Sequence, residues 1–456
     1  MIFRASYFLF FVSLVAAAQP TQPVPSPDTT VPAEEVRLSP ALFREGLKKR
    51  GLIDLLEQHL KEYPPASPSA ATLMTREVKL AEFADRTRPI DQRRAAIAEA
   101  NRLLEQLVAE NADDLRAIEW RMTLAHSLLY EDGESYATNL LYFGGTQADR
   151  RSLAPLTARA MTALRALVRQ IDAENKRIDS LSPRDFEKLE EAGFVEKLDR
   201  MGSSVGYLLL WGLFYDSLPR DEKDPVRARQ LSEIVKTFSD NPEWLATPHE
   251  KSHVQVPALL LAGMAERRLN NFVTARQHFE RAASAAERLT DDSEKDAAQW
   301  AITLTALEAG RNARDEGRFD AALAEVATLR AMPAVKSPAQ YGARLAAALL
   351  ERSILVDRAD SADKAGRSTD ARKFREDAWR SLATLAAEEP QHRPQLYSTL
   401  YKTMSAPGDS SAPRDPVETC ALLAGLLEDA TKDEAKKGEL LNRVIREAEQ
   451  YLSQAS

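Results

Sequence analysis

The sequence predicts an all-α protein, organised as an α-solenoid of antiparallel helical hairpins. Ala, Leu, Glu and Arg, which are strong helix formers, recur throughout the 456 residues. No run of alternating β-branched residues lies between turn residues, so we expect no strands. The residue pattern of one helical hairpin occurs twice between residues 254 and 334. Such a unit buries its apolar stripe only by stacking on neighbours.

The charge balance argues against a dedicated nucleic-acid binder. Asp and Glu number 69 against 61 Lys and Arg, a formal net charge of −8 at pH 7, whereas a nucleic-acid surface needs a basic excess. The length allows one long superhelix or roughly two to three compact domains. The one cysteine, Cys420, cannot form an internal disulfide, and we expect a buried thiol there.

The N-terminus has the features of a secretory signal peptide. A basic residue, Arg4, precedes an apolar core at 5–15, and the small residues Ala16 and Ala18 follow it. The apolar run is shorter than the roughly 20 residues that a membrane-spanning helix needs. We therefore expect residues 1–18 to be removed and the mature chain to be exported, to a bacterial periplasm or to the cell exterior.

A Pro-rich stretch at 19–38 predicts a disordered linker. A helical body is expected over 39–240, beginning at Ser39-Pro40, an N-cap residue followed by Pro at the first helical position. The segment 201–215 contains no charged residue and is expected to be the most deeply buried helix. Pro, Gly and N-cap residues predict helices at about 40–50, 52–62, 68–88, 90–111, 114–130, 147–178, 183–192, 201–215 and 224–238.

The apolar pattern loosens at 131–146, and a Pro-bounded loop is expected at 241–257. The repeats then occupy 254–405. A loop at 407–416 separates off a last helical hairpin at 417–452.

The two repeats carry matching residues 47 positions apart. A small residue on the first helix lets the second helix approach closely, and a large residue of the second helix fills the gap between hairpins. A weaker third copy places Gly366 and Ala371 where the second has Gly317 and Ala322. The matching pairs are Gly263 and Gly310, Phe272 and Phe319, Ala275 and Ala322, and Phe279 and Val326.

These positions resemble the tetratricopeptide-repeat (TPR) pattern, in which small residues recur on both helices and a turn residue precedes an aromatic one. Two features depart from that pattern. The period of 47 is longer than the 34 residues of the family. The aromatic residues of the first helix are replaced by Leu259 and Glu266, and in the second copy by Ala306 and Ala313. The resemblance implies a TPR-like α-solenoid with lengthened helices.

The resemblance also implies that the first helix of each hairpin lines a concave groove. Four arginines beside apolar side chains could then clamp the carboxylates of an extended peptide. The alternative is a set of solvated surface charges, since the third copy has Asp360 and Asp363 at the equivalent places. The residues expected to face the groove are Met264, Arg267, Arg268, Leu307, Arg311 and Arg314.

The sharpest catalytic motif is an H-E-x-x-H at 249–253. On a helix, His249 and His253 would share a face and could hold Zn²⁺, with Glu250 as general base. Prolines on both sides favour a loop instead, so we expect no metal here. A G-x-S-x-G match at 202–206 lacks the preceding strand that a hydrolase nucleophile requires, and close helix packing explains it better.

The sequence therefore favours an exported scaffold without catalysis of its own and without a cofactor. It would bind a protein or peptide partner that offers acidic or C-terminal carboxylate groups to the helical groove. The alternative is an envelope hydrolase in which His249, Glu250 and His253 form a zinc site.

Overall fold

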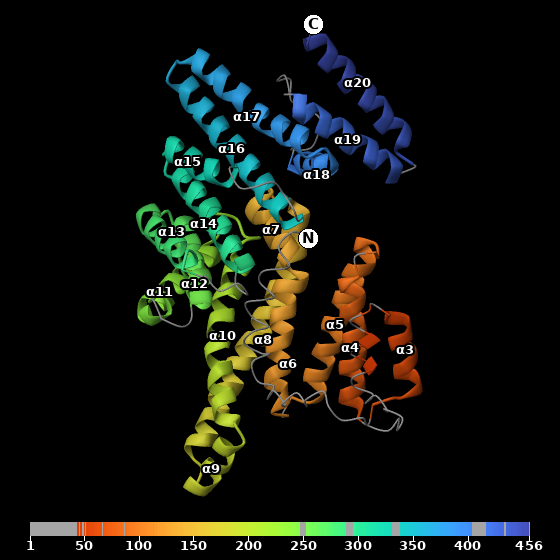
Figure 1. Ribbon diagram of the computed structural model, residues 1–456, viewed down its shortest axis with the longest axis vertical. Coiled ribbons are helices and arrows are strands. Elements are labelled where there is room, and N and C mark those ends of the chain that lie inside the picture. Colours follow the sequence, from red (N-terminus) through yellow and green to blue (C-terminus); the bar gives the residue numbers. More distant parts are fainter. Residues whose placement is uncertain are drawn as a thin grey trace, which may run out of the picture. The chain divides into compact units, whose positions relative to one another are not determined.

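The computed structural model describes most of the chain from residue 43 onward. Every regular element in the described ranges is a helix (Figure 1), which confirms the all-α prediction for this part of the chain. The predicted signal peptide and linker, residues 1–38, lie outside them. No helix within these ranges is long and apolar enough to cross a membrane. The described residues are 43–44, 46–47, 50, 52–65, 67–85, 87–112, 114–246, 252–288, 295–330, 338–403, 416–432 and 435–455.

The described chain forms two compact units whose segments alternate along the sequence. The first, here called the N-unit, contains the described residues up to 134 together with 154–215. The second, here called the repeat unit, contains 135–153 and the described residues from 216 onward.

The N-unit is built around the apolar C-terminal half of α10. Trp211 and Phe214 are 2% and 0% exposed, which confirms the expected burial for the C-terminal part of 201–215, whereas Ser203 near its start is exposed. A Cβ atom added to Gly212 would lie 2.7 Å from the sulfur of Met161, so α10 and α8 are in close contact there. The elements are α3 (Ile53–Glu62), α4 (Pro68–Ala84), α5 (Ile90–Glu110), α6 (Arg116–His126), the π-helix η1 (Ser127–Asp132), most of α8 (Gln147–Asp179), α9 (Pro183–Glu191) and most of α10 (Phe194–Ser217).

The repeat unit follows the chain as helices packed against their neighbours in sequence. Its central part consists of the three hairpins α12–α13, α14–α15 and α16–α17 (Figure 1). The elements are α7 (Glu134–Tyr142), α11 (Pro225–Asp240), η2 (Pro242–Trp244), α12 (Ser252–Arg268), α13 (Phe272–Ala286), α14 (Lys295–Asp315), α15 (Phe319–Arg330), α16 (Pro338–Lys364), α17 (Ser368–Glu388), η4 (Pro390–His392), α18 (Arg393–Thr403), α19 (Pro416–Lys432) and α20 (Lys437–Ala455).

The three central hairpins share one turn conformation. Asn270, Gly317 and Gly366 have φ values of 64°, 79° and 73°, in the left-handed region that favours Gly or Asn. The next N–H in each copy donates to a carbonyl five residues back, as in a Schellman motif. The repeat, including its third copy, is therefore a property of the backbone as well as of the sequence. These bonds join Asn271 to Glu266 at 2.9 Å, Arg318 to Ala313 at 2.8 Å and Arg367 to Ala362 at 2.9 Å.

The predicted close approach of the two helices in a hairpin is also present. A Cβ atom added to Gly263 on α12 would lie 2.5 Å from the Phe279 ring on α13. Phe279 is 1% exposed and Ala275, which opens the same helix, is fully buried. In the second copy, a Cβ atom added to Gly310 would lie 3.6 Å from the Ala322 carbonyl oxygen.

The expected loop at 241–257 is shorter than predicted. A 3₁₀ turn occupies part of it, and α12 already begins at Ser252 and contains Pro257. A proline this close to the start of a helix removes only one helical hydrogen bond. Burial of the apolar residues 258–261, all at most 2% exposed, favours continuing the helix through it.

Two further features differ from the sequence analysis. The stretch at 131–146, where the apolar pattern loosens, contains a helix that was not expected, α7 (Glu134–Tyr142), between Gly133 and Gly144. Glycines at both ends and a short apolar pattern concealed this helix. Cys420, expected to be a buried thiol, is exposed on α19.

Candidate functional site

The two apolar residues expected in the groove lie in the core of the repeat unit. Met264 on α12 is 3% exposed and Leu307 on α14 is fully buried. They support the packing of the first helices of successive hairpins. The four arginines lie on the same two helices, and each has a different surrounding.

Arg267 joins the first two hairpins through carboxylates of α14. Its guanidinium donates to Glu308 at 3.1 Å and to Asp315 at 2.6 Å. Glu308 is fully buried. Burial alone raises the pKa of Glu308, but the charges of Arg267, Arg311 and Arg268 outweigh this and hold it below its ordinary value. Glu308 is therefore a buried carboxylate surrounded by arginines.

Arg311 and Arg268 complete this surrounding. The guanidinium of Arg311 donates to the carbonyl of Leu141 and lies over the Tyr142 ring, 4.7 Å from its centroid, so it contacts α7. Burial, reinforced by the charge of Arg267, lowers the pKa of Arg268 to about 9. The lowering comes first from burial, whereas the charges of Glu308 and Asp315 raise the pKa of the neighbouring Arg267.

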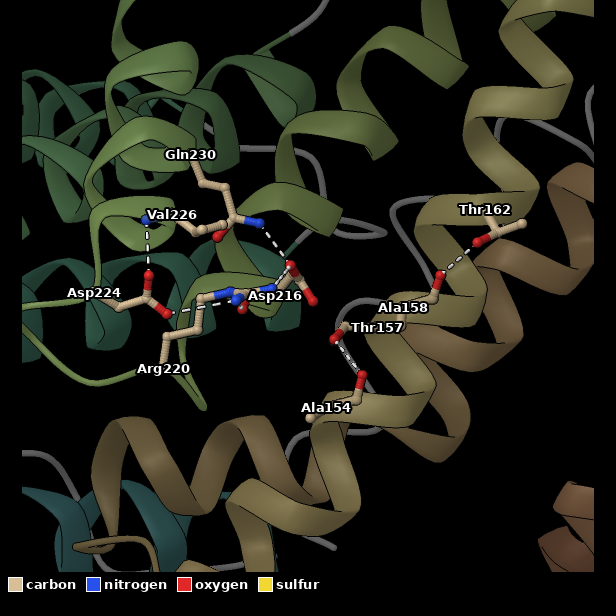
Figure 2. Close-up of polar contacts among 9 residues, drawn as sticks. All are labelled: Ala154, Thr157, Ala158, Thr162, Asp216, Arg220, Asp224, Val226 and Gln230. Atoms are coloured by element: carbon tan, nitrogen blue, oxygen red, sulfur yellow. Dashed lines mark hydrogen bonds and ion pairs between the residues drawn. The ribbon is translucent and has the colours of Figure 1, made fainter.

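A further arginine reaches the same region from α11. Burial lowers the pKa of Arg227; the charge of Glu222 opposes this, and the charges of Arg150 and Arg267 add to the lowering. Figure 2 shows what holds the start of α11: Asp216 accepts hydrogen bonds from Arg220 at 2.9 Å and Gln230 at 2.5 Å. This network fixes the helix that carries Arg227.

We call Arg227, Arg267, Arg268, Arg311, Glu308 and Asp315 the arginine cluster. It lies within the repeat unit and combines four guanidinium groups with two carboxylates. The side chains of Arg267 and Arg311 are 10% and 17% exposed, so part of each remains accessible.

Arg314 does not belong to the arginine cluster. It donates to Asp357 of α16 at 2.6 Å and so joins the second hairpin to the third, as Arg267 joins the first to the second. Asp360 and Asp363, the third-copy residues at the arginine positions, both accept from Arg375 of α17. The sequence periodicity placed these residues on one face, but it did not show which of them pair between hairpins.

The H-E-x-x-H motif lies mostly outside the described residues. His249 and Glu250 lie outside the described ranges, and of His253 only the backbone, in the first turn of α12, is described. In the described ranges no group of three His, Cys, Asp or Glu side chains has the arrangement of a metal site. The G-x-S-x-G match lies inside α10, where Ser203 and Ser204 donate to carbonyls four residues back. The motif therefore lies inside a helix and not on a strand-to-helix turn, but Gly202 does not serve close packing, because an added Cβ atom would lie 3.9 Å from an Ile171 methyl group.

A buried polar cluster at η1 was not predicted. Ser127 donates to Glu131 at 2.5 Å and Asn101 donates to Asp132 at 3.4 Å. Burial raises the pKa of Asp132. π-Helices are rare and often occur at functional sites. The only signal in the sequence was the loss of apolar periodicity after residue 130.

His278 on α13 gives the repeat unit a sensitivity to acid. Burial, and to a smaller extent the charge of Arg281, lowers the pKa of His278 from 6.5 to about 4. The folded state therefore binds fewer protons than the unfolded state between these values, so stability is lost as the pH falls from about 6.5 to about 4. After allowing for the partly exposed ring, we expect a loss of about 1–2 kcal/mol.

Thermal melting of the wild type and of His278→Gln at pH 7 and pH 5 tests this expectation. The variant should lose less stability on acidification than the wild type. Val273→Gln, at a position of the same helix that is 55% exposed and does not titrate, is the control and should keep the acid sensitivity of the wild type. Identical acid sensitivity of the His278 variant and the wild type would contradict the assignment.

Searches against protein-family models, curated proteins and solved structures found no match for this chain.

Proposed function

We propose that this chain is an exported, non-catalytic scaffold of the TPR-like α-solenoid type. It binds an acidic or C-terminal segment of a protein partner on the first helices of its hairpins. The observation that carries the proposal is the set of three guanidinium groups, those of Arg267, Arg268 and Arg311, whose charges act on the buried carboxylate of Glu308. A partner carboxylate would add a further negative charge beside these arginines.

The chemistry of arginine supports this ligand class. A guanidinium presents its N–H groups in a planar fork that matches a carboxylate and keeps its charge at neutral pH. A charge-assisted hydrogen bond shielded from water contributes about 1.5–3 kcal/mol. The charges of Arg267, Arg227 and Arg311 add to the effect of burial in lowering the pKa of Arg268, and an acidic ligand would oppose these charges.

Binding of defined peptides tests the proposal. Fluorescence anisotropy would compare a Glu-rich peptide with a free C-terminus, the same peptide amidated, and a Lys-rich peptide of equal length. The Glu-rich peptide should bind and the Lys-rich one should not, and the affinity should fall as salt rises. Arg268→Gln should weaken binding at least about tenfold.

Arg372→Gln, at an exposed arginine of α17, is the matched control and should bind like the wild type. If the Arg268 variant and the wild type bind the Glu-rich peptide with equal affinity, the arginine cluster is not part of the binding site. Elemental analysis for zinc distinguishes the proposed scaffold from the hydrolase alternative. One zinc per chain that disappears in His253→Ala would favour the alternative.

A further inference from the structure

A pocket lies where the turn of the second hairpin meets the third hairpin. Helix α16 packs against both α15 and α17 (Figure 1). The pocket has a volume of about 450 Å³, within the roughly 300–1,000 Å³ of small-molecule sites. We call it the α15 pocket. Its wall contains three arginines, one carboxylate and two aromatic rings: Arg318, Phe319 and Asp320 at the start of α15, Arg358 on α16, Arg367 just before α17, and Phe374 on α17.

The hairpin repeat itself places two of these arginines. Arg318 and Arg367 each follow the left-handed glycine of their turn, and each donates its backbone N–H to a carbonyl five residues back. The two side chains therefore leave the backbone at equivalent positions of successive hairpins, and both line the α15 pocket. At the equivalent position the first hairpin has Asn271, so this pairing of charges is particular to the second and third hairpins.

Arg358 adds a guanidinium whose orientation is fixed by an aromatic ring. It lies over the Phe374 ring, 4.5 Å from the centroid, and donates to Asp320 at 2.8 Å. Stacking uses the face of the guanidinium and leaves its N–H edge for hydrogen bonds. An N–H edge held in this way matches the oxygens of an anion.

The carboxylates that pair with these arginines are mostly exposed. The side chain of Asp320 is 86% exposed, and that of Asp370, which lies 3.8 Å from Arg367, is 52% exposed. Arg318 is also paired, with Glu316. Exposed ion pairs add little stability. An anion with more acceptor oxygens can therefore replace Asp320 and Asp370 at small cost.

The charges and the rings together indicate the class of ligand. A phosphate monoester offers three oxygens and about −1.5 to −2 charges at pH 7 to several guanidinium groups at once. A carboxylate offers two oxygens and a single charge. The first N–H groups of α15 also favour an anion, although the arginines define the site. Phe319 and Phe374 are half-buried in the same wall, so an apolar body would pack beside the phosphate.

We propose that the α15 pocket binds a small phosphate monoester with an apolar or aromatic body. Arg318, Arg358 and Arg367 hold the phosphate, and the two phenylalanine rings contact the body. The volume favours a small molecule over an extended chain. The α15 pocket shares no residue with the arginine cluster, so this proposal and the proposed peptide binding can fail independently.

Isothermal titration calorimetry of the full chain with phenyl phosphate tests the proposal. Phenyl phosphate should bind with a dissociation constant below about 1 mM. Inorganic phosphate should bind more weakly because it lacks the ring, and benzoate should bind at least about tenfold more weakly because it carries less charge.

Arginine substitutions test the assignment of the site. Arg358→Gln should weaken the binding of phenyl phosphate at least about tenfold. Arg367→Gln, at a more exposed arginine, should weaken it about threefold. Arg372→Gln, at an exposed arginine of α17 outside the pocket, is the matched control and should keep the affinity of the wild type.

Asp320→Asn should change the affinity in the opposite direction. It removes the carboxylate that competes for Arg358, so phenyl phosphate should bind about threefold more tightly, a gain that misfolding does not produce. The proposal is overturned if phenyl phosphate does not bind at several millimolar, or if Arg358→Gln keeps the wild-type affinity. Equal affinity for benzoate would assign a carboxylate ligand instead, and far tighter binding of a phosphotyrosine peptide would assign a protein partner.

Discussion

Replacing Gly263 by alanine should lower the free energy of unfolding of the repeat unit by about 2–3 kcal/mol. The added Cβ atom would lie 2.5 Å from one Phe279 ring carbon and 2.9 Å from two others. Phe279 is 1% exposed, so its ring cannot move aside without displacing its neighbours in the core. The two helices would have to separate, and this steric cost exceeds the gain in helix propensity from Gly to Ala.

The matched control, Gly202→Ala, should change the free energy of unfolding in the opposite direction. A Cβ atom at Gly202, inside α10, would meet only a methyl group of Ile171 at an ordinary contact distance of 3.9 Å. Gly202→Ala should therefore raise stability by about 0.5–1 kcal/mol through helix propensity alone. Urea denaturation followed by circular dichroism measures both changes, and hydrogen exchange localises the first to α12 and α13. If both Gly263→Ala and Gly202→Ala raise stability, the hairpin is not closely packed at Gly263.

The local features of the repeats were predictable because they depend on neighbours in sequence. A hairpin turn with a left-handed residue needs Gly or Asn, so Asn270, Gly317 and Gly366 revealed it directly. Close helix packing needs a small residue facing a large one, and Gly263 with Phe279 revealed that as well. Both signals act within one hairpin.

The arrangement of the arginine cluster was not predictable in the same way. Periodicity placed Arg267 and Arg311 on one face of their helices, but their surroundings depend on the register between hairpins. Glu308, the carboxylate they surround, had no distinctive sequence context. The contact with Tyr142 comes from α7, a helix that the sequence pattern did not reveal. Long-range pairing of charges follows from tertiary packing, which a single sequence does not encode locally.

Replacing Glu308 by glutamine should have the largest effect of a polar substitution in the repeat unit, about 3–5 kcal/mol. The variant keeps the shape of the side chain and removes the one fully buried carboxylate among the arginines. Arg267 would then retain Asp315, whose charge also acts on Arg311, but the charge of Glu308 would no longer oppose the charges of the neighbouring arginines at Arg268. A buried ion pair adds little stability when intact, yet losing one partner leaves an unpaired charge in a poorly solvated place.

Chemical denaturation of the Glu308 variant measures the loss, with Glu388→Gln as the matched control. Glu388 pairs with Arg344 at 2.5 Å but is 48% exposed, so its loss should cost at most about 1 kcal/mol. Equal effects of the two substitutions would mean that Glu308 does not compensate the arginines.

The dependence on pH gives a second measurement of the same interaction. The folded state holds the pKa of Glu308 below its ordinary value, so its contribution is present above the unfolded pKa of about 4.5 and disappears as the pH falls through the lowered value. The wild type and the Gln variant should therefore converge in acid. A constant difference down to low pH would assign the destabilisation to packing and not to charge.

Removing a second charge separates repulsion among the arginines from loss of a hydrogen bond. In the Glu308→Gln background, Arg268→Gln should restore part of the lost stability, although the same substitution has no such benefit in the wild type. An acidic peptide should also stabilise the Glu308 variant more than the wild type, because its carboxylate would replace the missing one. If neither the second substitution nor the peptide restores stability, the arginine cluster does not create a demand for an acidic ligand.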